Sequence, residues 1–206
     1  MALDLAKLCA PDHTALVLQE VQNGVVGSPS VLPALAEAAA AVDLVGNCAR
    51  LAAKARRCAV PVFHCTAATR SDLVGANRNA RLFLGVLKAP LQLTPGSDAV
   101  AVPEAIGVAD SDVVLERYHG VGPMTGTQLD SMLRNCGVTT IVGVGVSLNI
   151  GIVNLTLDAV NRGYQIVLPR DAVAGVPAEY GAAVLANSLA LLATITTTDD
   201  VLSAWT

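Results

Sequence analysis

Aromatic side chains are scarce in this chain, since phenylalanine, tryptophan and tyrosine together make up 3% of its 206 residues. Charged residues are also few, at 15%, whereas hydrophobic residues reach 53%. A core must therefore be built from small aliphatic side chains, which pack closely between the layers of α/β proteins. We expect a single domain over residues 1–206, with a short N-terminal extension at residues 1–13.

A basic excess is missing too. The net charge is −4, and a surface that binds nucleic acid needs clustered positive charge, so no nucleic-acid partner is expected. No apolar run free of charged and turn residues reaches the length of a membrane span. The N-terminal residues lack the pattern of a secretory leader. We expect a cytoplasmic protein that does not contact membranes.

Cysteine pairs with metal or disulfide spacing are absent. The five cysteines are odd in number and show no C-x-x-C spacing: Cys9, Cys48, Cys58, Cys65 and Cys136. Reduced thiols are the expected state, and neither a disulfide framework nor a zinc knuckle is predicted. The glycines between Gly143 and Gly151 do not form G-x-G-x-x-G, so a dinucleotide cofactor is not expected. We expect no cofactor of any kind.

Short β-branched runs alternate with longer stretches rich in alanine and leucine. This alternation predicts an α/β fold of three layers, in which a mostly parallel, six-stranded sheet has helices on both faces. The predicted strands are Thr14–Val21, Val60–Thr66, Asp112–Arg117, Thr139–Val146, Gln165–Leu168 and Thr194–Thr197. The predicted helices are Leu32–Arg57, Thr127–Asn135, Leu148–Asn161 and Ala178–Leu192.

The stretch from Ala67 to Asp110 is the least regular part of the chain and holds Pro90, Pro95 and Pro103. A connection of this length inside a compact domain usually covers a site or contacts a partner subunit. Its polar residues either reach an acidic substrate or lie in solvent or at a subunit contact. They are Arg70, Asn77, Arg78, Asn79 and Arg81.

Five segments occur in the order typical of one family. They are Glu20-Val21-Gln22-Asn23, Arg117 before Gly126-Thr127-Gln128-Leu129-Asp130, Gly145-Val146-Ser147-Leu148-Asn149-Ile150-Gly151-Ile152, Asp171-Ala172-Val173-Ala174 and Thr197-Thr198-Asp199-Asp200-Val201-Leu202. From Thr14 onward the chain thus resembles the isochorismatase-like (cysteine hydrolase) superfamily. The resemblance implies a Rossmann-like strand order and a site beyond the carboxyl ends of the strands.

The resemblance also implies three catalytic positions, and all three differ from the usual residues. Glu20 stands for the aspartate of D-x-Q-N, Arg117 for a lysine, and Gly151 for the nucleophilic cysteine. Glycine offers no nucleophile, so attack by a thiolate is closed at this position. True isochorismatases resemble this chain in lacking that cysteine, and they need only the carboxylic acid. Glu20 is therefore expected to serve as acid or base, with Arg117 as the partner of a carboxylate.

Further residues are expected to contact the substrate. They are Gln22, Cys65, His119, Val146, Ser147 and Asn149. Ser147 matches the peptide whose N–H helps to hold a carbonyl oxygen in this superfamily. For Cys65 the alternatives are a relocated nucleophile and a small buried residue, and for His119 a ligand contact and a plain surface loop. No D-x-H motif is present, so no metal site is expected, and His64 is read as a strand-end histidine.

The leading hypothesis is a cofactor-free hydrolase that acts on a small molecule, with an anionic one among the candidates. The alternative is a catalytically inactive member that binds a small molecule or a protein. A third hypothesis is a cysteine enzyme that uses Cys65. The resemblance and the high apolar fraction together predict a homo-oligomer.

Overall fold

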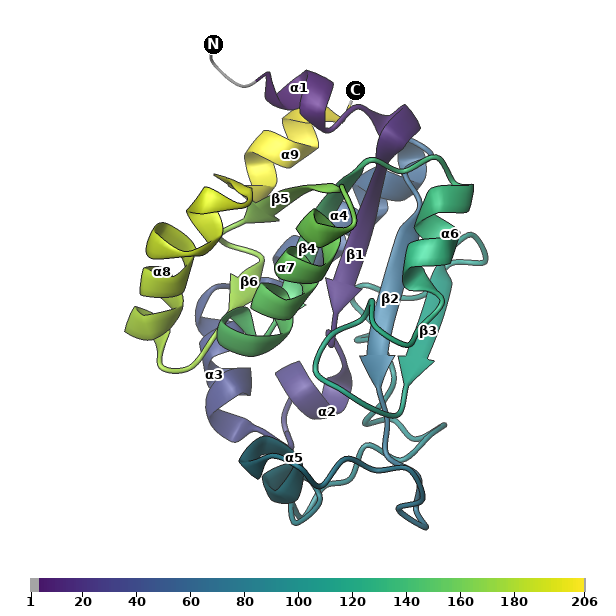
Figure 1. Ribbon diagram of the computed structural model, residues 1–206, viewed down its shortest axis with the longest axis vertical. Helices are drawn as coiled ribbons and strands as arrows, with labels where there is room; N and C mark the ends of the chain where they lie inside the picture. The colour runs from purple at the N-terminus through teal and green to yellow at the C-terminus, as the bar shows by residue number, and fades with distance from the viewer. Residues whose placement is uncertain (1–3, 206) are drawn as a thin grey trace.

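A buried central strand, β1, has parallel neighbours on both sides in a seven-stranded sheet (Figure 1). The computed structural model describes residues 4–205. The strands are β1 (Thr14–Gln19), β2 (Val62–Ala67), β3 (Val113–Arg117), β4 (Thr140–Val146), β5 (Gln165–Pro169), β6 (Val173–Ala174) and β7 (Thr194–Thr196). Their order is β3-β2-β1-β4-β5-β7, with the short β6 paired to β4, and each pairing is parallel. This is the Rossmann-like order that the sequence implies.

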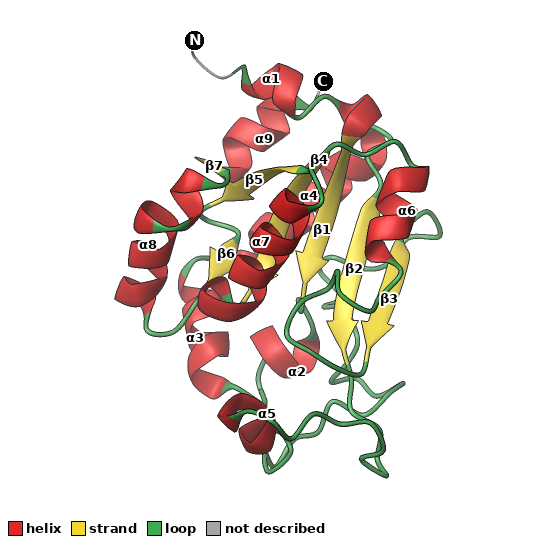
Figure 2. Ribbon diagram, viewed as in Figure 1, coloured by secondary structure: helices red, strands yellow, loops and turns green. Residues whose placement is uncertain are grey.

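Helices cover both faces of this sheet (Figure 2). The α-helices are α1 (Leu5–Leu8), α2 (Asn23–Val26), α3 (Pro33–Ala41), α4 (Leu44–Arg57), α5 (Arg81–Val86), α6 (Leu129–Asn135), α7 (Val153–Asn161), α8 (Ala178–Asn187) and α9 (Thr198–Ala204). Three shorter helical segments complete the set: η1 (Pro11–His13), η2 (Leu148–Ile152) and η3 (Leu189–Leu191). Apolar residues of α3, α4 and α9 cluster on one face, and those of α6, α7 and α8 on the other. The predicted three-layer α/β class is confirmed.

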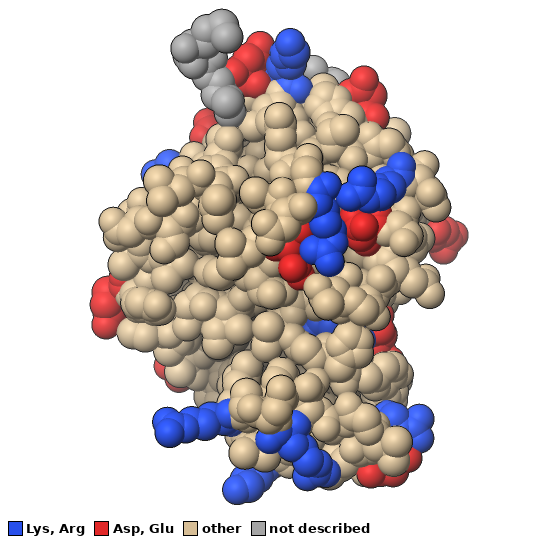
Figure 3. All heavy atoms as spheres, viewed as in Figure 1, with Lys and Arg blue, Asp and Glu red and all other residues tan. Residues whose placement is uncertain are grey.

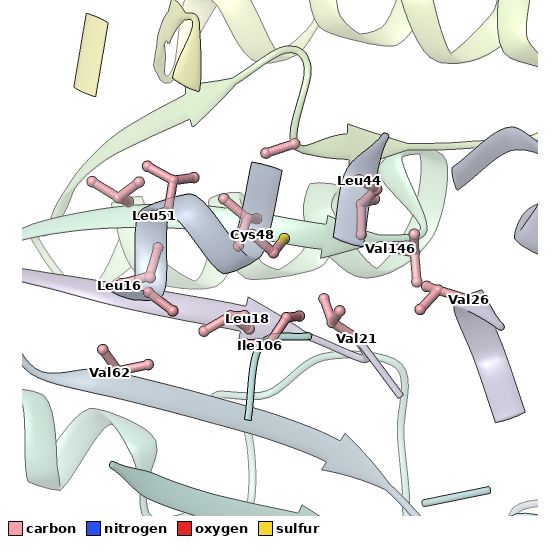
Figure 4. Packing of buried hydrophobic residues seen from close by; sticks show 14 of the residues in the cluster. Leu16, Leu18, Val21, Val26, Leu44, Cys48, Leu51, Val62, Ile106 and Val146 are labelled. Atoms are coloured by element: carbon pink, nitrogen blue, oxygen red, sulfur yellow. The ribbon is translucent and has the colours of Figure 1, made fainter. Parts of the chain in front are cut away.

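Strand β1 joins two apolar clusters because its side chains alternate between the faces of the sheet. Leu16 and Leu18 lie in one cluster with Leu51 of α4 (Figure 4). Val17 lies in the other cluster with Phe63 of β2. All six residues of the strand are buried. Truncating a buried leucine such as Leu16 to alanine costs about 2–5 kcal/mol, so β1 is a firm support for the residues that follow it.

The predicted helix Leu32–Arg57 is wrong as one element, because the structure has two helices there. α3 ends at Ala41 and α4 begins at Leu44. Between them Asp43 has φ +48°, a left-handed conformation that breaks the helical hydrogen-bond ladder. The alanine-rich sequence favours helix on both sides of Asp43, and Gly46, where a Cβ atom would meet the carboxylate of Asp43, lies inside α4 and does not mark the break.

Other bounds differ at the ends of elements. β1 ends at Gln19, before the predicted Val21, because Glu20 turns the chain with φ +52°. The predicted helix Leu148–Asn161 begins with the π-helical η2, and Ala178–Leu192 divides into α8 and η3. Elements outside the predicted set are α1, η1, α2, α5, β6 and α9.

The N-terminal extension is attached to the core. Leu5 and Leu8 of α1 pack against the same apolar cluster as Val201 of α9, and Figure 1 shows the two helices side by side. Residues 1–3 and 206 of the predicted single domain lie outside the described residues. Within residues 4–205, every helix is too short or too polar to cross a membrane.

The carboxyl ends of the strands define where a site can lie. The strand order reverses between β1 and β4, since β2 lies beyond β1 on one side and β5 lies beyond β4 on the other. Crossovers diverge at such a point and leave a crevice beyond the strand ends. Glu20 follows β1 there, Arg117 ends β3, and Ser147 follows β4.

Candidate active site

A cavity of about 120 Å³ lies beyond the carboxyl ends of β1 and β3 and against η2. One water needs roughly 10–15 Å³ of such space, so the cavity admits a small organic molecule. Gly151 lies at its wall, and its polar lining comes from Glu20, Thr69, Asn77, Arg117, Tyr118, His119 and Ser147. Its apolar lining includes Val25, Leu35, Leu82, Phe83, Val86, Leu87, Leu93 and Ile150. Three predicted catalytic positions thus meet at one cavity.

Glu20 is held at this cavity by its backbone. Its φ of +52° is uncommon for a residue with a side chain, and such conformations are often found at functional sites. Its N–H donates to the carbonyl oxygen of Cys65 at 2.9 Å, which ties it to β2. One fifth of its side-chain surface is exposed, so the carboxylate can meet a bound molecule.

Arg117 forms an ion pair with Glu20 across the strand ends. Its Nη2 donates to Glu20 Oε1, and its own side chain is 5% exposed. Burial lowers the pKa of Arg117 to about 10, which still leaves the guanidinium charged at neutral pH. A buried cation without a counter-charge is costly, so the carboxylate stabilises Arg117 as much as Arg117 orients the carboxylate.

Gly151 lies in η2, where the chain turns from β4 into α7. A Cβ atom at this position would lie 2.9 Å from the carbonyl oxygen of Val146 and 3.2 Å from Nε2 of Gln19. The first contact is with backbone, which gives way only with difficulty. The wall of the cavity is therefore shaped around a residue without a side chain.

Gln19 contacts Glu20, and reasoning from the sequence assigned Gln19 no role at the site. Its Nε2 donates to Glu20 Oε1 at 3.2 Å and to the carbonyl oxygen of Val121 at 3.3 Å. It is fully buried at the end of β1. The available signal was a long polar side chain that directly follows the aliphatic run from Ala15 to Leu18.

The loop after β3 and the residue after β4 supply further lining of the cavity. His119 lines the cavity and packs on Gly126, where a Cβ atom would lie 2.7 Å from the imidazole Cε1. Ser147 lines the cavity and follows a cis peptide bond from Val146. His119 and Ser147 therefore line the cavity, and their contact with a ligand stays a prediction.

Four predicted contact residues lie outside the cavity lining. Gln22 donates to the carbonyl oxygens of Ala67 and Val100 and accepts from the N–H of Ala67, so its amide is occupied by backbone. Asn149 donates to the carbonyl oxygen of Val176 at 3.3 Å. Val146 has its side chain in the core.

Cys65 is the fourth of these residues, and its position differs from the prediction because side chains alternate between the faces of β2, so Cys65 lies on the same face as Phe63. The side chain of Cys65 then points into the apolar cluster that includes Phe63 and Leu129, away from the cavity. Burial raises the pKa of Cys65 to about 12. A thiol in this environment is not a nucleophile at neutral pH.

His64 lies on the face of β2 opposite to Cys65. It is inside the strand, which continues to Ala67, and not at the strand's carboxyl end as predicted. Its Nε2 lies 3.0 Å from Asp112 Oδ2, and Asp112 also accepts from Arg56 at 2.6 Å. These three side chains form a largely buried polar cluster that does not line the cavity. Within residues 4–205, no group of three or more histidine, cysteine, aspartate or glutamate side chains is arranged to hold a metal ion.

The irregular segment from Ala67 to Asp110 covers the cavity, as its length suggests. Its α5 and flanking residues supply the apolar lining, and Asn77 accepts a hydrogen bond from the N–H of Gly120 at 2.9 Å. Basic side chains gather at the end of the molecule where α5 lies (Figure 3). Arg78, Arg81 and Lys88 are exposed in this segment, and no ion pair involves them among the residues that the structure describes.

Comparison with known proteins gives the same family as the motifs. The isochorismatase domain model matches residues 14–200. The uncharacterized isochorismatase family protein YecD of Escherichia coli O157:H7 is 29% identical over 199 residues, which are 93% of this chain and 95% of YecD. An isochorismatase family protein from Burkholderia thailandensis superposes with a TM-score of 0.76 at 28% identity, over 94% of this chain and 96% of its own.

A cysteine hydrolase from Pseudomonas syringae pv. phaseolicola 1448A shares the fold. Its TM-score is 0.81 over 100% of this chain and 98% of its own, at 22% identity. The domain match, the full-length relative and the shared fold agree with one another. The chain belongs to the isochorismatase family.

Proposed function

We propose that this protein hydrolyses a small molecule without a covalent intermediate at position 151 and without a cofactor. Glu20 is the acid or base, and Arg117 orients its carboxylate or a carboxylate of the substrate. The observation that carries the proposal is the Glu20–Arg117 ion pair at the wall of an apolar cavity. Glycine at position 151 leaves water as the nucleophile.

The geometry supports a division of labour between the two oxygens of Glu20. Arg117 and Gln19 both donate to Oε1, and no described residue donates to Oε2. Oε2 is thus the oxygen that can exchange a proton with a bound molecule. With a small amide, Glu20 takes a proton from water as the water attacks the carbonyl carbon, and returns it to the departing nitrogen. The products are an acid and an amine.

With a vinyl ether such as isochorismate, the same oxygen of Glu20 would first donate a proton and then accept one. Protonated Glu20 gives its proton to the terminal carbon of the double bond, and water then adds to the cation that forms. The water that adds returns a proton to Glu20, and the resulting hemiketal breaks into a ketone and an alcohol. An acid with two donors on its other oxygen is held in one orientation, which suits either direction of transfer.

An anionic substrate is favoured by exposed basic residues on the segment that covers the cavity. Arg78, Arg81 and Lys88 lie exposed in the irregular segment from Ala67 to Asp110, and Arg117 lines the cavity. Positive charge around an opening raises the local concentration of anions, and this effect weakens with salt. Turnover of an anionic amide should therefore fall with ionic strength more steeply than turnover of a neutral analogue.

The test is product formation, followed by NMR, with isochorismate and with a series of small amides that do or do not carry a carboxylate. Glu20→Gln should lower turnover by about 10²–10⁴-fold, the usual contribution of a positioned acid or base. Glu116→Gln is the matched control, because Glu116 is an exposed carboxylate next to Arg117 and outside the cavity. If no substrate is turned over, but a ligand raises Tm and is recovered unconverted, the result would instead favour the inactive binding protein.

We also propose that the protein forms a homo-oligomer. Support comes from α5, whose sequence is mostly apolar although none of its residues is buried. Leu84 of this helix is 41% exposed, and Val74, in the same irregular segment, is 67% exposed. Apolar side chains that gather on a surface commonly mark a subunit contact. Light scattering coupled to size-exclusion chromatography measures the subunit number, and Leu84→Glu should lower it.

A further inference from the structure

Gln19 has a buried side-chain amide whose orientation is fixed by its neighbours. Nε2 lies within hydrogen-bond distance of two oxygens, Glu20 Oε1 and the carbonyl oxygen of Val121. An amide nitrogen has two protons, and these two acceptors use both. The reversed amide would place Oε1 of Gln19 against both oxygens, which is repulsive. The NH₂ group therefore faces the carboxylate.

The other end of the same amide is poorly satisfied. Oε1 of Gln19 is buried and has no hydrogen-bond partner among residues 4–205. An unpaired buried carbonyl opposes folding, and an apolar side chain of the same length would avoid this cost. Stability alone therefore does not explain a glutamine here. What distinguishes it from a methionine is the pair of donors that it directs at Glu20 and Val121.

Gly151 leaves room for the amide of Gln19, because it has no side chain. The Cβ position of residue 151 lies 3.2 Å from Nε2 of Gln19, so even an alanine would press on the NH₂ group. The amide of Gln19 thus occupies space that the side chain of a larger residue at position 151 would need. The glycine and the glutamine fit one another across the carboxyl ends of β1 and β4.

We infer that Gln19 is a positioning residue for Glu20, and that Gly151 makes room for its amide. Gln19 and Arg117 hold Oε1 from two sides, so that Oε2 faces the bound molecule. The importance of Gln19 for turnover rests on the proposed function. Its contact with the Glu20 carboxylate does not, and it can be measured in the absence of any substrate.

The experiment compares Gln19→Met with Gln22→Met in the full chain. Both glutamines are buried, but the amide of Gln22 bonds only to backbone of Ala67 and Val100. The protonation midpoint of Glu20 is followed by ¹³C NMR of its carboxylate, and Tm is measured in parallel. A lost donor favours the protonated acid, so Gln19→Met should move the midpoint upward and leave Tm equal or higher. Gln22→Met should lower Tm and leave the midpoint in place.

Several results would overturn the inference. They are an unchanged Glu20 midpoint in Gln19→Met, a Tm loss as large as that of Gln22→Met, and failure of Gln19→Met to fold. Each would assign Gln19 a structural role only. If wild-type protein turns over no substrate but the midpoint still moves, the proposed function fails and the positioning role stands. With an active wild type, Gln19→Met should lower kcat at least 10-fold with little change in KM, since it removes orientation and not binding.

Discussion

Arg117, the last residue of β3, donates a hydrogen bond to Glu20, which follows β1 on the far side of β2. Two elements distant in the sequence therefore share one charge pair at the edge of the sheet. The pair is almost closed to solvent on the arginine side, where 5% of the side chain is exposed. Its removal is expected to affect both folding and the proposed chemistry, and the two effects can be separated by choosing which partner is changed.

Arg117→Ala should lower the free energy of unfolding by about 3–5 kcal/mol, because it leaves a carboxylate without its buried counter-charge. Arg117→Lys should lose less, since the charge is kept and only the planar fork is lost. Urea denaturation gives both values. The double variant Glu20→Leu/Arg117→Met should recover most of the stability but none of the activity. Equal stability of wild type and Arg117→Ala would show that the pair contributes nothing to folding.

The meeting of Glu20 and Arg117 at one cavity could be predicted from the sequence, because each lies at the carboxyl end of a strand and each occupies a family motif. The strands themselves were predictable, since strands covered on both faces, such as β1 and β4, are almost wholly apolar. The break at Asp43 was not, because it depends on a backbone conformation inside a run that favours helix.

Contact residues were harder to predict because the direction of each side chain depends on which face of a strand it lies on and on what packs there. Cys65 points into the core because it lies on the same face of β2 as Phe63, and Gln22 bonds to backbone that only the folded chain brings near. Gln19 was missed for the opposite reason, since a residue within a strand is assigned to the core by default. The cavity lining from α5 has no motif, because apolar contacts impose few constraints on residue type.

Replacing Gly151 by alanine or cysteine should destabilise the protein by about 1–3 kcal/mol, the usual cost of overpacking. The added Cβ atom meets the carbonyl oxygen of Val146 at 2.9 Å and the amide of Gln19 at 3.2 Å. Gly151→Cys should therefore not create a working thiol enzyme. Part of the cost should disappear in Gln19→Ala/Gly151→Ala, which a double-mutant cycle would measure as coupling. Strict additivity would show that the two residues do not compete for space.

Thiol reactivity should follow burial. Cys136 is exposed, whereas Cys9, Cys48 and Cys65 are buried, and burial raises the pKa of Cys9 and Cys65 to about 12. An aromatic disulfide reagent at pH 8 should modify Cys136 within minutes and the three buried thiols only after unfolding. Cys65→Ser should retain the activity of the wild type. Loss of turnover in Cys65→Ser, with unchanged Tm, would revive the hypothesis of a relocated nucleophile.

Stability should fall as the pH decreases below about 6.5, and His64 should cause much of this fall. Burial lowers the pKa of His64, while the hydrogen bond from its ring to Asp112 opposes the shift and Arg56 adds to it. In the unfolded chain a histidine titrates near 6.5, so below that pH the unfolded state binds a proton that the folded state resists. The free energy of unfolding must then decrease from pH 7 toward pH 5.

Replacing His64 by glutamine should flatten this part of the stability profile, because glutamine can still donate to Asp112 but does not titrate. His13→Gln is the matched control, since His13 is partly exposed beside Asp12. Urea denaturation at half-unit steps between pH 5 and pH 8 measures the slope for each protein. A slope that survives in His64→Gln but disappears in His13→Gln would place the titrating group at the N-terminal extension and not in the buried cluster of Arg56, His64 and Asp112.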